Sequence, residues 1–477
     1  MARLLVRCGM MPYEPITAID MLAKDRMGSN SGNLVYQHSV IRTLLTEENE
    51  IFADGYLIDP MQAEQINADY DAYILPLADA FRHDFRKKLR DYAELFNRLT
   101  IPVYVIGVGL RAPYEPNLKE GFAFDEDVKA FVSAVLNKSQ MIGLRGQITA
   151  DYLTRLGFQA ETDHTVIGCP SLYTFGDTLR IKPLKLDSQA AISVNASNVS
   201  FKRAVDFLEN ITHTYPNHCF VPQVYPELSL TYLGGPSIRG TAPNYPHQIT
   251  SDLYKSGKVK FFLNAATWFE YIKQADLSIG TRLHGNIVAT INGTPNITIV
   301  QDARMRELAD YHQLTAVSVQ EVHAGTKLTD LVEQVDFHSA ENVHAARFAH
   351  FIAFLDKNNI NHIYQTDHQR KTAPLDQIVV NTSMPEAVEP ITAISDEAKL
   401  IRLQQGLDVQ KEKTDNEKRQ LLEFWQAKTA VLEQTRNANG LRSVLPESLK
   451  KPIRRTRNIA SRIIGKWKSP FDMIDKN

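Results

Sequence analysis

Short apolar runs alternate with amphipathic stretches through the first 180 residues of the chain. Five runs have the length and composition of buried strands: 3–8, 71–77, 102–110, 141–146 and 165–170. Four stretches between them repeat apolar residues at helical spacing: 33–45, 84–99, 125–137 and 147–156. Strands that alternate with helices in this way predict a parallel sheet that is covered by helices on both faces.

A polar, proline-containing segment at 176–189 interrupts this alternation, and a second series follows it. Its expected strands are 190–196, 219–225, 258–262, 275–280, 296–300 and 315–319, and its clearest helices are 200–214 and 265–274. The sequence therefore predicts an α/β fold with two tandem Rossmann-like, doubly wound domains, 1–180 and 181–365. Because ligands of such sheets bind at the carboxyl ends of the strands, we expect the site in the cleft between the domains.

The composition changes beyond residue 365. Residues 366–395 are rich in threonine, proline and polar residues, which is typical of a linker. Residues 396–477 form an expected helical and basic extension, in which 396–436 has helical apolar spacing and is a candidate for oligomerisation. The tail interleaves basic residues with isoleucines, most densely at 450–468, and this pattern suits an anionic membrane surface or an acidic partner.

The overall composition argues against several classes of protein. A net charge of −2 argues against a molecule built to coat nucleic acid. Cys8, Cys169 and Cys219 are far apart and form no CxxC pair, so neither a disulfide framework nor a cysteine zinc site is expected. No apolar run reaches the roughly 18 residues of a membrane span. We expect a cytoplasmic protein without metal or cofactor, peripheral to the inner face of the membrane if the basic tail binds it.

The densest group of chemically useful residues is the turn TRLHGN at 281–286, between an expected strand and an expected helix. Arg282 offers a fork of donors that matches a carboxylate or a phosphate, and His284 can exchange a proton near neutral pH. Gly285 lets a bound group approach the backbone, and the first N–H groups of the helix favour an anion. The turn predicts an anion-binding catalytic site. The alternatives are a structural ion pair for Arg282 and a helix cap for His284.

Other polar residues also follow expected strands or precede expected helices. The candidates for substrate binding are Thr281, Gly285, Asn286, Arg145, Arg111, Asp302, Arg304, Ser31 and Asn33. Asn195 and Gln223 also end expected strands and are weaker candidates. Salt bridges between neighbouring loops would equally explain Asp302 and Arg304, and a plain capped loop would explain GSNSGN at 28–33.

The segment GTRLHGNIVATINGTPNITI (280–299), followed by D-x-R-x-x-E-L (302–308), resembles the polysaccharide pyruvyl transferase family. The shared features are an Arg-x-His-Gly turn between a strand and a helix, then Gly-x-Pro and an aspartate-containing loop. Weaker similarity extends through much of residues 1–320. The chain departs from the family at PLADAFR (76–82), where a Gly-Gly pair is common, and at Cys169, where an aspartate often stands.

The resemblance implies a two-domain fold like that of B-type glycosyltransferases. It also implies phosphoenolpyruvate as the donor and, as the acceptor, a sugar of a cell-surface polysaccharide or of its lipid-linked precursor. In that interpretation Arg282 and Arg145 bind the anionic groups of the donor and His284 is the acid/base. Two other hypotheses stay open: a glycosyltransferase of the same fold that uses a nucleotide sugar, and a non-catalytic assembly protein of polysaccharide synthesis.

Overall fold

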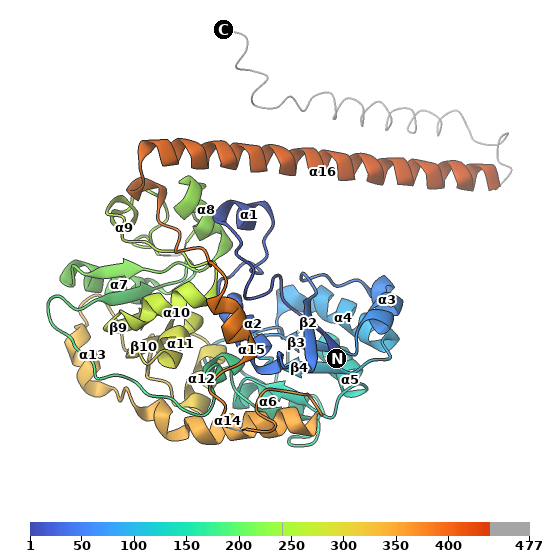
Figure 1. Cartoon of the computed structure of the whole chain (residues 1–477), viewed down its shortest axis with the longest axis horizontal. Coiled ribbons are helices and arrows are strands. Elements are labelled where there is room, and N and C mark those ends of the chain that lie inside the picture. The colour runs from blue at the N-terminus through green and yellow to red at the C-terminus, as the bar shows by residue number, and fades with distance from the viewer. Residues whose placement is uncertain (241, 368, 439–477) are drawn as a thin grey trace, which may run out of the picture. The chain divides into compact units, whose positions relative to one another are not determined.

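A computed structural model describes residues 1–240, 242–367 and 369–438 of the chain (Figure 1). The chain divides into two compact units, Met1–Leu407 and Asp408–Asn477. Both sheets and the cleft discussed below belong to the first unit. Helix α16 (Asp396–Ala438) begins in the first unit and supplies the described residues of the second.

The first sheet is parallel throughout and has the strand order β2-β1-β3-β4. Its strands are β1 (Ala2–Val6), β2 (Asn49–Ala53), β3 (Ala72–Pro76) and β4 (Val103–Ile106). Two further parallel strands, β5 (Ile142–Leu144) and β6 (His164–Val166), pair with each other. A bridge between Val108 and Leu144 joins this pair to the end of β4.

Alternation along the strands explains why helices cover both faces of this sheet. On β1, Leu4 and Val6 belong to the core that contains α2 (Gly32–Leu44), whereas Leu5 belongs to the opposite core. That opposite core contains α3 (Ala63–Asp69), α4 (Arg86–Arg98) and α5 (Asp125–Leu136). Successive side chains of a strand point to opposite faces, so one apolar strand supplies both cores.

The second sheet is also parallel, with the order β11-β10-β9-β7-β8. Its strands are β7 (Ile192–Asn195), β8 (His218–Phe220), β9 (Leu277–Gly280), β10 (Asn296–Val300) and β11 (Ala316–Ser318). Helices α7 (Lys202–Thr214) and α13 (Leu328–Gln334) share one core with these strands. Helices α10 (Ala265–Lys273), α11 (Leu283–Ile291) and α12 (Ala303–His312) belong to the core that contains α2. The predicted α/β fold with two Rossmann-like, doubly wound domains is confirmed.

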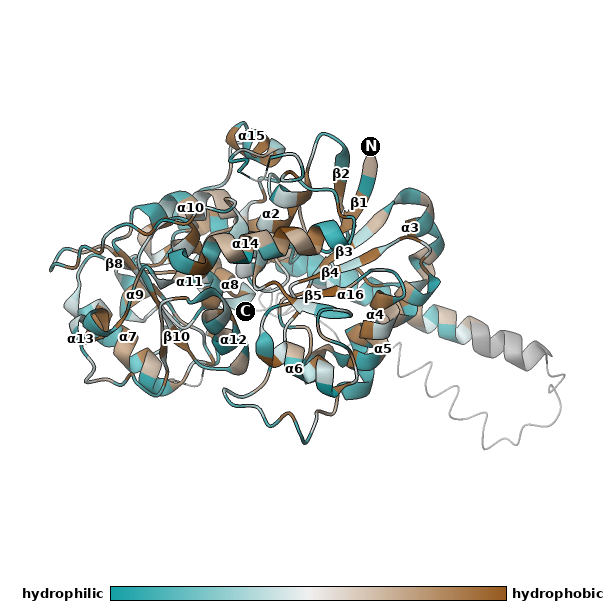
Figure 2. Ribbon diagram, turned by 90° about the horizontal axis from the view of Figure 1, so that it is seen from below, coloured by the Kyte–Doolittle hydropathy of each residue, from teal (hydrophilic) through white to brown (hydrophobic). Residues whose placement is uncertain are grey.

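The remaining α-helices connect or flank these layers. They are α1 (Ala18–Ala23), α6 (Gln147–Arg155), α8 (Tyr225–Leu233), α9 (Asp252–Lys255), α14 (Ser339–Lys357) and α15 (Pro374–Val380). The strands are predominantly apolar, and polar residues gather on the outer helices (Figure 2). In the described part of the chain, no helix combines the length and the apolarity that crossing a membrane would require.

Several expectations from the sequence differ from the structure. The strand expected at 219–225 ends at Phe220, and Tyr225 is already the first residue of α8. Residues 258–262 are not a strand of the sheet, because only isolated bridges form there, from Val259 to Phe220 and from Phe261 to Val388. The segment expected to be a linker, 366–395, belongs to the first compact unit. Asp376 of α15 binds the buried Arg42 of α2 through two hydrogen bonds, of 2.8 and 2.7 Å.

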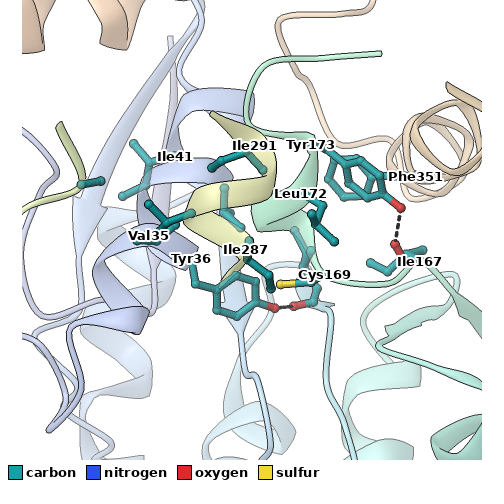
Figure 3. Close-up of a cluster of buried hydrophobic side chains, with 14 of the residues drawn as sticks. Val35, Tyr36, Ile41, Ile167, Cys169, Leu172, Tyr173, Ile287, Ile291 and Phe351 are labelled. Atoms are coloured by element: carbon teal, nitrogen blue, oxygen red, sulfur yellow. Dashed lines mark hydrogen bonds between the residues drawn. The ribbon is translucent and has the colours of Figure 1, made fainter. Parts of the chain in front are cut away.

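The two domains share one apolar core, which fixes α2 against α11. Val35 of α2 and Ile287 of α11 pack there with Leu172 and Tyr173 of the 3-10 helix η3 (Pro170–Tyr173) (Figure 3). Tyr173 also stacks on Phe351 of α14, with ring centroids 5.0 Å apart. Because α2 and α11 pack on each other, their N-terminal ends are held at the same cleft. The tail predicted to bind a membrane, 450–468, lies outside the described residues, and oligomerisation through 396–436 stays a prediction.

Candidate active site

A cleft of about 860 Å³ opens between the two domains of the first unit. Its walls include residues that directly follow strands of both sheets, as the strand-end rule predicts. Nine candidates from the sequence line it: Asn33, Arg111, Arg145, Gln223, Thr281, Arg282, His284, Asp302 and Arg304. The other four, Ser31, Asn195, Gly285 and Asn286, do not.

The guanidinium group of Arg282 has buried hydrogen-bond donors that no described residue accepts. Its backbone N–H donates a 2.8 Å hydrogen bond to Asn195 Oδ1, which fixes the turn at the N-terminus of α11. In the side chain, Nε and one terminal nitrogen are buried and have no partner among the described residues. Burial lowers the pKa of Arg282, and the attraction of Glu227 does not compensate for it. The Arg282 side chain makes no ion pair within 4 Å of a described carboxylate, although Glu227 attracts it, and its binding of an anion stays a prediction.

His284 lies in the first turn of α11 with an unused ring nitrogen. Its Nε2 is buried and has no partner among the described residues. The pKa of His284 lies well below its ordinary value, first because of burial and then because of the positive charges of Arg145 and Arg304. The imidazole is therefore neutral at pH 7 and can accept a proton. His284 is not the helix cap, because Arg282 holds the N-cap position of α11. The side chain of Arg282 makes no capping hydrogen bond.

Asn286 and Gly285 support the turn from behind and do not line the cleft, and their contact with a substrate stays a prediction. The carboxamide of Asn286 accepts from Asn195 Nδ2 at 3.0 Å and from Ser278 Oγ at 2.9 Å, and it donates to Gly280 O at 3.0 Å. A β-carbon at Gly285 would come within 2.7 Å of Gln223 Nε2. A larger residue at this position would therefore have to displace the side chains of Gln223 and Asn195.

Arg145 contributes its positive charge to the cleft more than it contributes hydrogen-bond donors. It is buried, and its Nε donates to Gly107 O at 2.9 Å while its carbon Cζ lies 4.9 Å from the centre of the Tyr36 ring. One terminal nitrogen lies 3.5 Å from the sulfur of Cys169. A thiol is a weak acceptor, so Cys169 does not neutralise Arg145, whereas the carboxylate of Asp79 attracts it.

Asp302 and Arg304 do form the salt bridges that were the alternative explanation for them. Arg304 binds Asp79 Oδ2 at 3.1 Å and Asp302 Oδ2 at 3.2 Å, but its Nε is buried without a partner in the described structure. The other oxygen of Asp302 accepts from Met305 N at 2.9 Å and caps α12. Burial opposes the ionisation of Asp79, but the nearby Arg304 and Arg82 lower its pKa below the usual value. Asp79 therefore stays charged and orients both arginines.

Three further residues predicted for the site are Ser31, Asn33 and Arg111. Ser31 occupies the N-cap position of α2, but its hydroxyl makes no capping bond and it does not face the cleft. Asn33 donates from Nδ2 to Met27 O and Gly28 O, both at 3.0 Å, and so fixes the loop before α2. Arg111 is exposed at the cleft.

The sequence analysis did not identify several polar residues that line the cleft, among them Arg7, Gln37, Asp79, Arg82 and Lys88. Arg7 follows β1 and Asp79 follows β3, so the strand-end rule that selected Arg145 applies to them as well. Gln37 lies inside a helix and gave no such signal, although its Oε1 is buried and unpartnered in the described structure. Among the described residues, no group of three or more histidines, cysteines or carboxylates is arranged to hold a metal ion.

Two parallel α/β domains thus enclose a cleft that is lined by several basic residues, with a His-Gly turn at the N-terminus of α11. The family model described as polysaccharide pyruvyl transferase matches residues 43–302. That match covers more than half of the 477 residues, and the chain belongs to this family. The resemblance noted in the sequence is confirmed, and the family implies a transferase with a glycan acceptor.

No curated protein matches the chain. Among solved structures, the complex of MnaA from S. aureus with UDP is similar with 11% identity and a TM-score of 0.42, over 76% of this chain and 98% of that one. The UDP-GlcNAc 2-epimerase of Methanocaldococcus jannaschii is similar with 11% identity and a TM-score of 0.39, over 74% and 99% of the two chains. Anabaena HepE with UDP gives 14% identity and a TM-score of 0.36, over 75% and 96%. At these scores the similarities carry no information about the substrate of this chain.

Proposed function

We propose that this protein transfers the pyruvyl group of phosphoenolpyruvate to two hydroxyl groups of one sugar, forming a ketal. The observation that carries the proposal is that two guanidinium nitrogens of Arg282 and the Nε2 of His284, two residues apart at the N-terminus of α11, are buried without a partner among the described residues. The donor has a carboxylate and a phosphate, and clustered guanidinium groups are the donors that match such anions.

Arg282 and Arg304 are the residues proposed to bind the donor. Each has buried N–H groups without a partner among the described residues, and both line the same cleft. Arg145 adds a further positive charge to the same cleft, and the first N–H groups of α11 add the positive end of a helix. Asp79 holds Arg304 through its ion pair and keeps the guanidinium in place.

The proposed reaction is an addition followed by a substitution. A sugar hydroxyl adds to the central carbon of phosphoenolpyruvate, and the methylene carbon takes up a proton to become a methyl group. The bond from that central carbon to the phosphate oxygen breaks, and a second hydroxyl of the same sugar takes its place. The two hydroxyl protons end on the methyl group and on the released phosphate, so the products are the pyruvyl ketal and inorganic phosphate.

His284 is the proposed acid/base because it enters the reaction neutral. A neutral imidazole can take the proton of the attacking hydroxyl, and such a group typically contributes about 10²–10⁴-fold to the rate. The bound donor brings negative charge beside the arginines that lower the pKa of His284. That charge raises the pKa again, and the imidazolium can then hold the proton until it is passed on.

The test is a product assay by mass spectrometry with phosphoenolpyruvate and a panel of free and lipid-linked glycans. The proposal expects a pyruvyl ketal on one acceptor, with release of one phosphate per ketal. Replacing phosphoenolpyruvate by nucleotide sugars is the matched control. Glycosyl transfer from a nucleotide sugar, without any ketal, would contradict the proposal.

A further inference from the structure

Glu227 is a buried carboxylate of the second domain that does not line the cleft. Its side chain belongs to the first turn of α8, and the residue is 1% exposed. One carboxylate oxygen accepts hydrogen bonds from the backbone N–H groups of Gln223, at 2.7 Å, and of Val224, at 2.8 Å. The other oxygen accepts from the hydroxyl group of Tyr245. All of these hydrogen bonds hold Glu227 within its own domain.

The loop that Glu227 fixes packs against the turn that carries Arg282. A β-carbon at Gly285 would come within 2.7 Å of Gln223 Nε2, so this loop is in contact with the first turn of α11. The carbonyl oxygen of Gln223 also accepts from Ser31 N at 2.8 Å, next to the start of α2. The packing of the loop therefore brings the carboxylate of Glu227 close to Arg282, although the two side chains form no ion pair.

Glu227 and Arg282 stabilise each other's charge inside the protein. Burial lowers the pKa of Arg282, Glu227 raises it, and Arg304 lowers it further. Burial raises the pKa of Glu227, and Arg282 opposes that increase. Two guanidinium nitrogens of Arg282 still have no hydrogen-bond partner among the described residues. The carboxylate thus acts as a counter-charge through space, and it leaves these N–H groups available.

We propose that Glu227 is a positioning residue, which keeps the guanidinium of Arg282 charged and enclosed while the donor site is empty. This inference rests on the proposed function, because Arg282 is assigned to phosphoenolpyruvate. A bound anion supplies the same counter-charge, so Glu227 and the donor compete for the attraction of Arg282. Coupling between two such groups is reciprocal. The charge of Glu227 therefore stabilises the free protein and weakens donor binding.

The alternative is that Glu227 only caps the N-terminus of α8. Glutamine is as suitable as glutamate for that capping position, so Glu227→Gln removes the charge and keeps the cap. We expect this variant to bind phosphoenolpyruvate at least about fivefold more tightly than the wild type in calorimetry. The free variant should unfold at a lower urea concentration. Unchanged or weaker binding of phosphoenolpyruvate would overturn the inference.

Glu341→Gln is the matched control for a general loss of stability. Glu341 also accepts a backbone N–H, that of Ile181 at 2.7 Å, but it does not line the cleft and is not among the charges that act on Arg282. This variant should unfold at a lower urea concentration and keep the wild-type affinity for phosphoenolpyruvate. Tighter binding in both variants would mean that the gain does not come from Glu227, and would overturn the inference.

A double-mutant cycle in urea unfolding tests the pair without any ligand. Removing one member of a buried charge pair is more destabilising than replacing both by neutral residues. Glu227→Gln should therefore lower the urea midpoint less in an Arg282→Met background than in the wild type. Equal shifts in both backgrounds would overturn the inference, whether or not phosphoenolpyruvate binds.

The cycle also separates this inference from the proposed function. If phosphoenolpyruvate does not bind the wild type, the donor assignment fails while the cycle still decides on Glu227. If Glu227→Gln alone does not fold, the double variant is expected to fold, because it carries no unpaired charge at this position. Failure of the double variant to fold would count against the inference.

Discussion

His284 lies directly against Gly32, so that a β-carbon at Gly32 would come within 2.8 Å of the imidazole Nδ1. Gly32 is the first residue of α2 in one domain, and His284 is in the first turn of α11 in the other. The two helices share the apolar core shown in Figure 3. The position of the proposed acid/base therefore depends on the packing between the domains.

Replacing Gly32 by alanine should displace the imidazole without unfolding the protein. A shift of about 1 Å at a catalytic group can cost about 100-fold in rate, so we expect a fall in kcat of about 10- to 100-fold. Affinity for phosphoenolpyruvate, measured by calorimetry, should change little because Arg282 stays in place. Gly325→Ala is the control, since Gly325 is exposed and outside the cleft. Equal kcat in both variants would show that Gly32 does not position His284.

The protonation of His284 can be followed by its imidazole resonances in NMR spectra. The free protein should show a neutral ring at pH 7, with protonation only well below the ordinary range, since burial and the arginines lower the pKa. Saturating phosphoenolpyruvate should move the midpoint to higher pH, because the donor's negative charge offsets those arginines. Arg282→Gln should reduce that shift. A midpoint near 6.5 in the free protein, unchanged by the donor, would contradict the assigned role.

The titration of Glu307 should make the free energy of unfolding depend on pH. This residue of α12 accepts hydrogen bonds from Thr149 N at 2.9 Å and from Thr149 Oγ1 at 2.8 Å, at the start of α6. Burial raises the pKa of Glu307 from 4.5 to about 7. The folded state therefore binds a proton that the unfolded state has already released between these values. Its stabilising contribution is present below pH 4.5 and is lost as the pH rises through 7.

Urea unfolding at several pH values checks this expectation. Between pH 4.5 and 7 the wild type should lose up to about 3 kcal/mol relative to Glu307→Gln, which cannot release a proton. Parallel stability curves for the two proteins across this range would mean that the carboxyl group titrates normally in the folded state.

The ion pair between Arg42 and Asp376 should stabilise the fold through the segment that follows the two domains. The Arg42 side chain is 1% exposed, and that of Asp376 is 29% exposed. Asp376→Asn leaves a buried guanidinium without its counter-charge, and we expect a loss of about 2 kcal/mol in the free energy of unfolding. Glu126→Gln, in an exposed pair with Lys129, is the control and should have no measurable effect. A similar result for both variants would show that α15 does not contribute to stability.

Much of the fold could be predicted because buried parallel strands are continuous apolar runs. The strands expected at 275–280 and 296–300 lie within two residues of β9 and β10. The strand prediction was wrong where contacts with the rest of the fold decide whether a segment forms a strand. Residues 49–53 carry polar residues and form β2 at a sheet edge, whereas the apolar run at 258–262 pairs only through isolated bridges.

The site could be predicted where a residue follows a strand within a dense turn, as with Arg282 and His284. The sequence could not show that Asn286 faces inward, because a polar helix residue near a turn can either bind a ligand or hold the backbone. Nor could it show Asp79 beside Arg304, since that pair joins residues 225 positions apart. Such contacts depend on how the two sheets meet.

The most direct test of the proposed site compares His284→Ala with Arg282→Ala in donor binding and in ketal formation. His284→Ala should bind phosphoenolpyruvate within a few-fold of the wild type and lose about 10²–10⁴-fold in turnover. Arg282→Ala should lose roughly 10- to 100-fold in affinity for phosphoenolpyruvate, because hydrogen bonds to a charged group are removed. Full turnover in both variants, or loss of donor binding in His284→Ala alone, would contradict the account.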